Sequence, residues 1–298
     1  MPARGRGGTR RRRVSPGPPS VFGAAPIEIG GGIRMRGDMM HAGIVARYVL
    51  PAATLLFLLV LWQVLVTALN VPALLLPPPS AIGAELVKWR GLMFQHSLVT
   101  LYETVLGFLL GIVLGVPMAV AISTSRLLQN TIYPLIILAQ SIPKVTIAPL
   151  FLIWLGYGIL PKVFVGFLVA FFPIVIDTAT GLNSVEPELL DLTRALSASE
   201  WQTLWRIRFP QALPFFFSGL KVSITLAVIG AVIGEFVGSN QGLGYLILTG
   251  TAELKTAFVF ACMLLLSAIG IGLFALLVAI ERFLIPWHAS HRSQAIGA

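Results

Sequence analysis

Residues 213–236 read LPFFFSGLKVSITLAVIGAVIGEF, a run in which Lys221 and Glu235 are the only charged residues. At 1.5 Å per residue, a helix of this length crosses the roughly 30 Å of hydrocarbon in a bilayer. Inside lipid the backbone must satisfy its own hydrogen bonds, so an apolar run of this kind forms a helix. The stretch therefore predicts a membrane-spanning helix.

Five further apolar stretches of similar length lie near 48–70, 97–121, 131–154, 160–181 and 257–281. The 298 residues are 56% hydrophobic and 11% charged, with a mean hydropathy of +0.88, whereas a soluble domain carries about 25% charged residues. This composition excludes a soluble enzyme and a disordered chain. The sequence predicts an all-α, polytopic membrane protein with six transmembrane helices, forming one domain over 47–285.

The net charge of +9 is concentrated at the N-terminus, where residues 1–47 hold nine arginines against Glu28 and Asp38. We expect 1–46, which is basic and rich in Pro and Gly, to be a disordered cytoplasmic tail, and 286–298 to be a short second one. An arginine run can also contact nucleic acid or acidic lipid headgroups, but no nucleic-acid partner is expected. With the N-terminus inside, the inner segments hold fifteen Lys and Arg residues and the outer segments four, which predicts that both termini are cytoplasmic.

The most polar stretch outside the tail, residues 186–210, reads EPELLDLTRALSASEWQTLWRIRFP. Pro187 suits the first turn of a helix, and apolar residues recur after it at helical spacing. The run from Ser197 to Glu200 has the form of a capping box, which predicts that a second helix begins there with Trp201, Leu204 and Trp205 on one face. Two short amphipathic helices with a bend between them are expected on the cytoplasmic side. A helix resting on lipid headgroups is the alternative.

The spacing in this loop resembles that of the permease subunits of bacterial ATP-binding-cassette (ABC) importers. Their pattern is E-A-A, three residues, G, nine residues and I-x-L-P. The corresponding run here is Asp191-Leu192-Thr193, three residues, Ser197, nine residues and Ile207-Arg208-Phe209-Pro210. Because Ser197 replaces the glycine, the bend must either form without a positive φ or accept strain.

Four further stretches carry a resemblance to the nitrate/sulfonate/taurine subgroup of these permeases: LPPPSAI (76–82), QSIPKVTIAPLFLIWLGYG (140–158), FFPIVIDT (171–178) and ALPFFFSGLKVSITLAVIGAVIGEFVGSNQGLGYLI (212–247). The resemblance implies that 186–210 holds a coupling helix that docks on a separate ATPase. The residues expected to carry this role are Asp191, Thr193, Arg194, Leu196, Ser197, Ile207 and Pro210.

The resemblance also implies partners: a second permease subunit in a homodimer, ABC ATPase subunits that bind ATP and Mg, and an extracytoplasmic solute-binding protein. None of the five lysines follows a glycine, so the chain has no G-x-x-x-x-G-K-[ST] phosphate-binding loop. We therefore expect a non-enzymatic subunit without a cofactor of its own, in the bacterial inner membrane. By resemblance, its solute is small and anionic, like nitrate, a sulfonate or taurine, and it crosses by alternating access.

Placing a charged group near the centre of the bilayer costs at least about 2.5–3.5 kcal/mol of free energy, so each such group is expected to have a function or a partner. Lys144 lies between Pro143 and Pro149, and a proline-broken helix at depth lines a cavity or is buried in protein. The substrate path is therefore expected at Ser141, Pro143, Lys144 and Lys221. For Lys221, pairing with Asp177 and extension to the membrane interface are alternatives.

Two stripes of small residues are expected to pack against other spans, within the subunit or across a dimer. They are Gly107, Gly111 and Gly115 on one helix, and Gly230, Gly234 and Gly238 on another. Beside them, Glu103 and Glu235 are expected toward the outer side, where they line a gate, meet a binding protein or lie at headgroup depth.

An ion-gradient-driven secondary transporter or channel is the alternative function. It predicts inverted repeats and carboxylates near the midplane, and no convincing repeat occurs. An intramembrane hydrolase would need a nucleophile with a base partner. Ser141 and Lys144 have the S-x-x-K spacing, but Pro143 obstructs the helical turn that this motif requires.

Overall fold

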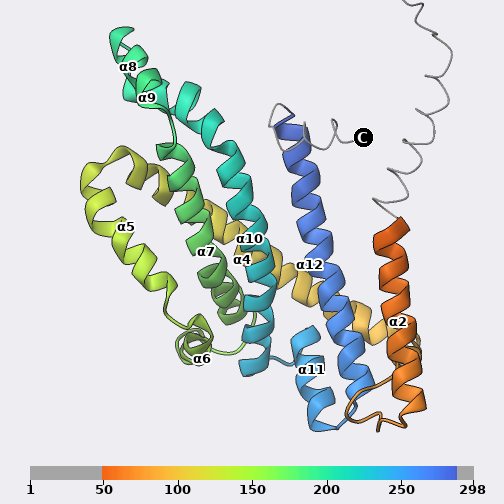
Figure 1. Ribbon diagram of the computed structural model, residues 1–298. Coiled ribbons are helices and arrows are strands. Elements are labelled where there is room, and N and C mark those ends of the chain that lie inside the picture. The colour runs from red at the N-terminus through yellow and green to blue at the C-terminus, as the bar shows by residue number, and fades with distance from the viewer. Residues whose placement is uncertain (1–48, 287–298) are drawn as a thin grey trace, which may run out of the picture. The chain divides into compact units, whose positions relative to one another are not determined.

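The computed structural model describes residues 49–286, which contain helices and connections and no strand (Figure 1). The chain divides into two units, 1–50 and 51–298. The first unit lies almost wholly outside the described residues, so everything below concerns the second. The predicted tails 1–46 and 286–298, except for Pro286, also lie outside the described residues.

Within residues 49–286, five helices are long and apolar enough to cross a bilayer. They are α2 (Leu50–Ala68), α4 (Arg90–Thr124), α7 (Leu160–Asn183), α10 (Phe209–Gly238) and α12 (Thr256–Leu284). A sixth span is formed by α5 (Arg126–Gln140) together with η2 (Lys144–Ile147) and α6 (Ala148–Leu155), which meet at a bend of 88°. The all-α, six-span prediction is confirmed, and one of the spans is broken.

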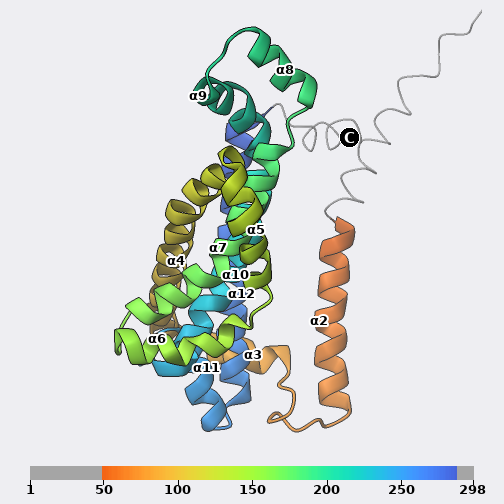
Figure 2. The ribbon, with the colours of Figure 1, turned by 90° about the vertical axis from the view of Figure 1, so that its left-hand side faces the viewer.

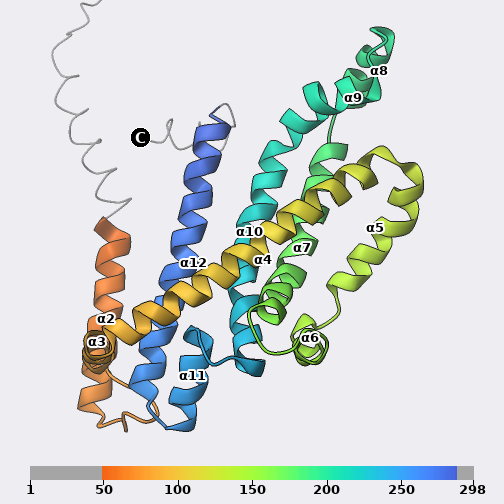
Figure 3. The same cartoon turned by 180° about the vertical axis from the view of Figure 1, so that it is seen from behind.

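The centre of the bundle is formed by α7 and α10, with α4 crossing both obliquely (Figure 3). Half of the residues in the apolar parts of α7 and α10 are buried, against 6% in α2 and α12. The core includes Phe108 of α4, Ala170 and Ile174 of α7, and Phe217 and Ile224 of α10. The outer helices therefore leave most of their apolar surface for lipid or for other chains.

Both predicted glycine stripes lie where helices approach closely. A Cβ at Gly230 would stand 2.7 Å from the Cα of Gly166 on α7, and a Cβ at Gly107 would stand 2.9 Å from the backbone oxygen of Val163. The other four glycines also face neighbouring helices: Gly111 and Gly115 face Ile174, Gly234 faces Lys162, and Gly238 faces Leu152. The contacts of both stripes lie within one subunit.

Substituting Gly230→Ala is expected to destabilise the bundle by about 1–3 kcal/mol, because the added methyl group meets a backbone that must move. Gly270→Ala is the matched control, since a Cβ there has nothing within 4 Å and alanine favours a helix. Thermal unfolding of both variants in detergent measures the difference. Equal midpoints would contradict the close packing of α7 and α10.

Two short helices of the described residues lie outside the predicted spans. The first, α3 (Pro79–Lys88), precedes α4, and the second, α11 (Leu243–Ala252), follows α10. Ten residues are too few to span a bilayer. α11 packs against α10 and the first half of α12, at the end of the bundle away from α8 and α9 (Figure 1).

Candidate functional site

Residues 187–203, here called the α8–α9 segment, project beyond the ends of α7 and α10 (Figures 1 and 2). The segment consists of α8 (Pro187–Ala195) and α9 (Glu200–Thr203). α9 continues through a π-helical turn, η3 (Leu204–Arg208), into α10, so that Glu200–Gly238 is one helix of 39 residues. α9 is therefore joined to the central helix α10 without a loop between them.

The bend between α8 and α9 is a left-handed helix cap. Ser197 has φ +54°, the N–H of Ala198 donates to the oxygen of Thr193 at 3.0 Å, and the N–H of Ser197 donates to the oxygen of Arg194 at 3.0 Å. This is the hydrogen-bond pattern of a Schellman motif, whose left-handed residue is usually glycine. Of the two alternatives that the sequence left open, the backbone thus accepts strain at Ser197.

The predicted position of the capping box is wrong by two residues. The box is formed by Ser199, whose Oγ accepts from the N–H of Gln202 at 3.2 Å, and by Gln202, whose Oε1 accepts from the N–H of Ser199 at 2.9 Å. Ser197 cannot cap α9 because its left-handed backbone closes α8, whereas an N-cap needs the extended conformation that Ser199 has.

Substituting Ser197→Gly is expected to stabilise the bend by about 1 kcal/mol, because glycine removes the steric cost of a positive φ. Ser197→Val is expected to destabilise it by more, since a β-branched residue fits this region poorly. Hydrogen exchange at the Ala198 amide measures both, with Ala195→Val as the control in ordinary helical backbone. Faster exchange in Ser197→Gly would contradict the strain.

The α8–α9 segment exposes apolar side chains. Leu196 is 72% exposed and Trp201 is 65% exposed, and Trp201 lies edge-on to Trp205. Leu204 is buried against Leu182 and Ala212, so the expectation that it shares the exposed face of the two tryptophans is wrong. An exposed apolar surface on a projecting element is typical of a docking site.

The other residues predicted for coupling fall into two groups. Asp191 and Arg194 form an exposed ion pair of 2.8 Å beside Leu196 and Ser197. Thr193 is buried and donates to the oxygen of Leu190, and Ile207 and Pro210 are half-buried where η3 meets α10. The sequence pattern did not single out Arg208, whose guanidinium donates to the oxygen of Ser123 at 3.2 Å and so ties η3 to the last turn of α4.

The broken span exposes non-helical backbone on the surface of the single chain. Ser141 and Pro143 are exposed at the break. Lys144 donates from Nζ to the oxygen of Gln140 at 2.7 Å and lies over the ring of Phe172 at 4.6 Å. Among the described residues no acidic group pairs with Lys144.

Lys221, the fourth residue predicted for the substrate path, has a structural partner. Its Nζ lies 3.0 Å from a carboxylate oxygen of Glu281 on α12. Pairing with Asp177 is therefore wrong as an expectation. Lys221 is paired with an acid between α10 and α12, whereas Lys144 is half-buried at the break and has no acidic partner among the described residues.

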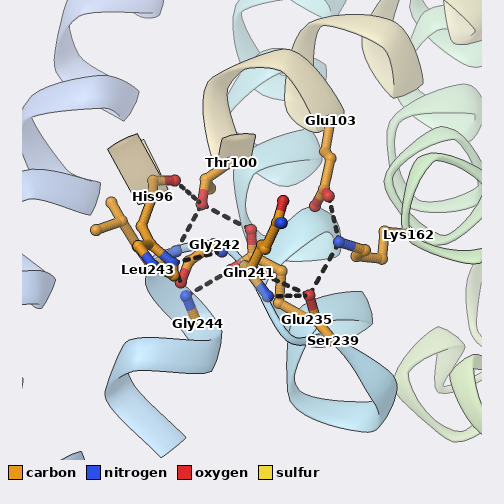
Figure 4. Close-up of polar contacts among 10 residues, drawn as sticks. All are labelled: His96, Thr100, Glu103, Lys162, Glu235, Ser239, Gln241, Gly242, Leu243 and Gly244. Atoms are coloured by element: carbon orange, nitrogen blue, oxygen red, sulfur yellow. Dashed lines mark hydrogen bonds and ion pairs between the residues drawn. The ribbon is translucent and has the colours of Figure 1, made fainter. Parts of the chain in front are cut away.

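A buried polar cluster surrounds the start of α11 (Figure 4), at the end of the bundle away from the α8–α9 segment (Figure 1). Lys162 of α7 forms an ion pair with Glu103 of α4 and donates to Ser239 Oγ at 2.9 Å. The side chains of Lys162 and Glu103 are 7% and 0% exposed. The pair joins two spans and the connection after α10.

The second part of the cluster holds the start of α11. Glu235 accepts from Thr100 Oγ1 at 2.6 Å and from the N–H of Gly244. His96 Nδ1 accepts from the N–H of Gly242 at 2.9 Å, and a Cβ at Gly242 would collide with the Glu235 carboxylate at 2.1 Å. Glu103 and Glu235 are thus fully buried in protein rather than exposed to headgroups.

An open cavity of about 590 Å³ adjoins this cluster. Its walls include Glu103, Lys162, Tyr102, Tyr157, Ser239 and Asn240. Of these residues, only Glu103 was a candidate from the sequence. The others were missed because the residues that line the cavity come from α4, α7, the α6–α7 connection and the α10–α11 connection, which lie far apart in the sequence. Polar residues next to paired glycines, as in SNQGLG (239–244), are the signal that could have pointed to the site.

Apolar spans, one of them broken, and a projecting α8–α9 segment joined to the core define a multi-pass membrane protein. The chain belongs to the family described as binding-protein-dependent transport system inner membrane component, whose model matches residues 111–287. The resemblance deduced from the loop is thereby confirmed, and with it the assignment to ABC importer permeases of the bacterial inner membrane.

Two curated relatives cover most of the chain. It is 35% identical to the formylaminopyrimidine transport permease protein ThiX of Halalkalibacterium halodurans over 80% of this chain and 95% of the relative. It is 29% identical to the putative aliphatic sulfonates transport permease protein SsuC of Bacillus subtilis over 90% of this chain and 97% of the relative. The likeness to the sulfonate subgroup is confirmed.

Among solved structures, the chain is similar to an inward-facing conformation of the MetNI methionine ABC transporter. The TM-score is 0.57 at 21% identity, over 65% of this chain and 97% of that chain. At this identity the likeness supports the fold alone. The fold of the permease class is thus found both by sequence and by shape.

Proposed function

We propose that this permease moves a small solute by alternating access, driven by ATP that a separate ATPase chain binds with Mg. The observation that carries the proposal is the uninterrupted helix Glu200–Gly238, which joins the exposed α8–α9 segment to the core. A rigid element of this length converts a push at one end into tilting of the spans. The Asp191–Arg194 ion pair and the helix cap at Ser197 hold the α8–α9 segment in one conformation, in which Leu196 is exposed.

The ATPase docks on Leu196 and Trp201 and on the Asp191–Arg194 pair beside them. Docking of the ATPase there requires that the α8–α9 segment faces the cytoplasm, and in this orientation both termini are cytoplasmic. The same orientation gives the inner segments more Lys and Arg residues than the outer segments, as is usual for membrane proteins. The solute-binding protein then meets the opposite end, near the polar cluster.

A second copy of the chain covers the broken span. Non-helical backbone at membrane depth is tolerated only where protein covers it or where it lines a water-filled cavity. Ser141 and Pro143 are exposed in the single chain, so a homodimer with the translocation path between its subunits satisfies both conditions. The bilayer covers α2 and the outer face of α12.

The solute carries a negative group. Lys144 is half-buried at the break, and its ammonium group donates to the oxygen of Gln140 but has no acidic partner among the described residues, so its positive charge is left to attract an anion. The relative SsuC is named for aliphatic sulfonates, whereas ThiX is named for formylaminopyrimidine. We favour a sulfonate-like or nitrate-like solute because an unpaired lysine at depth is expensive without an anion.

Reconstitution in vesicles tests the proposal. The permease is combined with its ATPase and binding protein, and uptake of nitrate, ethanesulfonate, taurine and formylaminopyrimidine is measured with and without ATP. We expect uptake of at least one of them only when the ATPase and ATP are present. Uptake by the permease alone, driven by an ion gradient, would show a secondary transporter or channel instead.

A further inference from the structure

Arg208 links the base of the α8–α9 segment to a second span. It lies in η3, and its guanidinium donates to the oxygen of Ser123 at 3.2 Å. Ser123 is in the last turn of α4, where carbonyl groups have no donor within the helix and a nearby cation is favourable. Among the described residues no acidic group pairs with Arg208, so its charge is left to hold the end of α4.

Apolar packing supports the same contact between η3 and α4. Leu204, one turn before Arg208, is buried. It lies in a small core cluster with Leu182 of α7 and Ala212 of α10, and Val120 of α4 packs against that cluster. The base of the α8–α9 segment therefore meets the end of α4 through both an apolar and a polar contact.

The link is made at a π-helical turn. In η3 the N–H of Phe209 donates to the oxygen of Leu204, five residues earlier. Turns of this kind are rare inside α-helices and occur frequently at functional sites. Because η3 is the point where α9 joins the central helix, a movement of α9 reaches Arg208 before it reaches the rest of α10.

The end of α4 is joined to α5 by a single residue, Ser125, here called the α4–α5 corner. Ser125 Oγ accepts from the N–H of Leu128 at 3.4 Å, and its backbone oxygen accepts from the N–H of Gln129 at 2.9 Å. The corner lies at the same end of the bundle as the α8–α9 segment (Figure 3). α5 runs from the corner to the break at which Lys144 lies, so a displacement of the corner is passed to the broken span.

We propose that Arg208 is a positioning residue for coupling, which passes a displacement of the α8–α9 segment through Ser123 to the α4–α5 corner and so to the broken span. This role rests on the translocation function proposed above and adds a second route to the one through α10. α10 moves because it is continuous with α9, whereas α5 receives the movement through the contact at Ser123. ATP binding then moves α10 and the broken span together.

Fluorescence at two introduced cysteines tests this route without knowledge of the solute. Leu127→Cys places a bimane label at the start of α5, and Glu188→Cys places one in the first turn of α8. Both positions are exposed, whereas the native Cys262 is fully buried, which keeps the background low. The full chain, in complex with its ATPase in nanodiscs, is compared with and without ATP. We expect ATP to shift the emission at both positions.

Arg208→Met is expected to abolish the shift at Leu127→Cys and to leave the shift at Glu188→Cys, because methionine fills the space of the stem but donates no hydrogen bond. Arg206→Met is the matched control, since Arg206 is exposed in the same π-helical turn. Arg208→Lys keeps a cationic donor and should keep most of the shift at Leu127→Cys.

Uptake per ATP hydrolysed gives a second readout, which a merely structural role would not move. In vesicles with the binding protein, Arg208→Met should lower this ratio at least about fivefold, whereas Arg206→Met should not. The solute is whichever of nitrate, ethanesulfonate, taurine and formylaminopyrimidine the unchanged complex takes up. Binding of the ATPase, measured by co-purification, should be the same in both variants.

In the chain that keeps Arg208, a shift missing at either cysteine would overturn the proposal. A shift at Leu127→Cys that survives in Arg208→Met, or that is lost in Arg208→Lys, would also overturn it. Loss of the shift at both cysteines in Arg208→Met would show that Arg208 holds the fold or the ATPase, with the same consequence. Any of these results in a complex with intact ATP-driven uptake would leave the importer function standing, whereas absence of ATP-driven uptake by the unchanged complex would overturn the proposed function itself.

Discussion

Lys162→Met is expected to lower the free energy of unfolding by about 3–5 kcal/mol, because it leaves the Glu103 carboxylate buried without its partner. Glu103 is fully buried on α4, and Lys162 is its only cationic neighbour among the described residues. The substitution also removes the hydrogen bond from Lys162 to Ser239, which holds the connection between α10 and α11. Thermal unfolding of the detergent-solubilised complex measures the loss.

The double variant Glu103→Gln/Lys162→Met is expected to recover most of this stability, since it removes both charges from the interior. Lys88→Met is the control, because the Lys88–Glu85 pair is 3.6 Å long and its lysine is 64% exposed, where such pairs contribute about 0–1 kcal/mol. A loss in Lys162→Met no larger than in Lys88→Met would show that the buried pair does not hold α4 to α7.

The composition predicts a membrane protein, because 11% charged residues are too few for a soluble surface, and the number of spans follows from the apolar stretches. The break in the third span was also predicted, since Pro143 and Pro149 each remove a backbone donor. The 88° angle of the break depends on packing against α7, which no local pattern contains.

The ion pairs between different helices could not be predicted from the sequence. Glu103 and Lys162 are separated by 59 residues, and Lys221 and Glu281 by 60. Several acids were equally plausible partners for each lysine until the helices were placed. Asp177, for example, lies against Gly219 rather than against Lys221.

The capping box shows the same limit at short range. Both Ser197 and Ser199 can cap a helix, and each is followed three residues later by Glu or Gln. The choice is made by the cap of α8, which places Ser197 in the left-handed region. The position of the capping box at the start of α9 therefore depends on how the preceding helix, α8, ends.

Leu196→Glu is expected to weaken ATPase binding by about 2 kcal/mol or more, roughly 30-fold, and to abolish ATP-driven uptake. Leu196 is 72% exposed at the tip of the α8–α9 segment and touches no core cluster, so the substitution leaves the bundle intact. The charge would have to be buried in the ATPase without a partner, which is costly. Co-purification with the ATPase and uptake in vesicles measure the two effects.

Leu127→Glu is the matched control, since Leu127 is 71% exposed at the start of α5 but lies outside the α8–α9 segment. Equal losses in both variants would reflect a general effect of an added carboxylate on this end of the bundle. A loss confined to Leu196→Glu, with unchanged thermal unfolding, requires that the ATPase acts through the tip of the segment. Because α9 and α10 form one helix, that result would support the proposal that contact at the tip couples ATP hydrolysis to movement of the core.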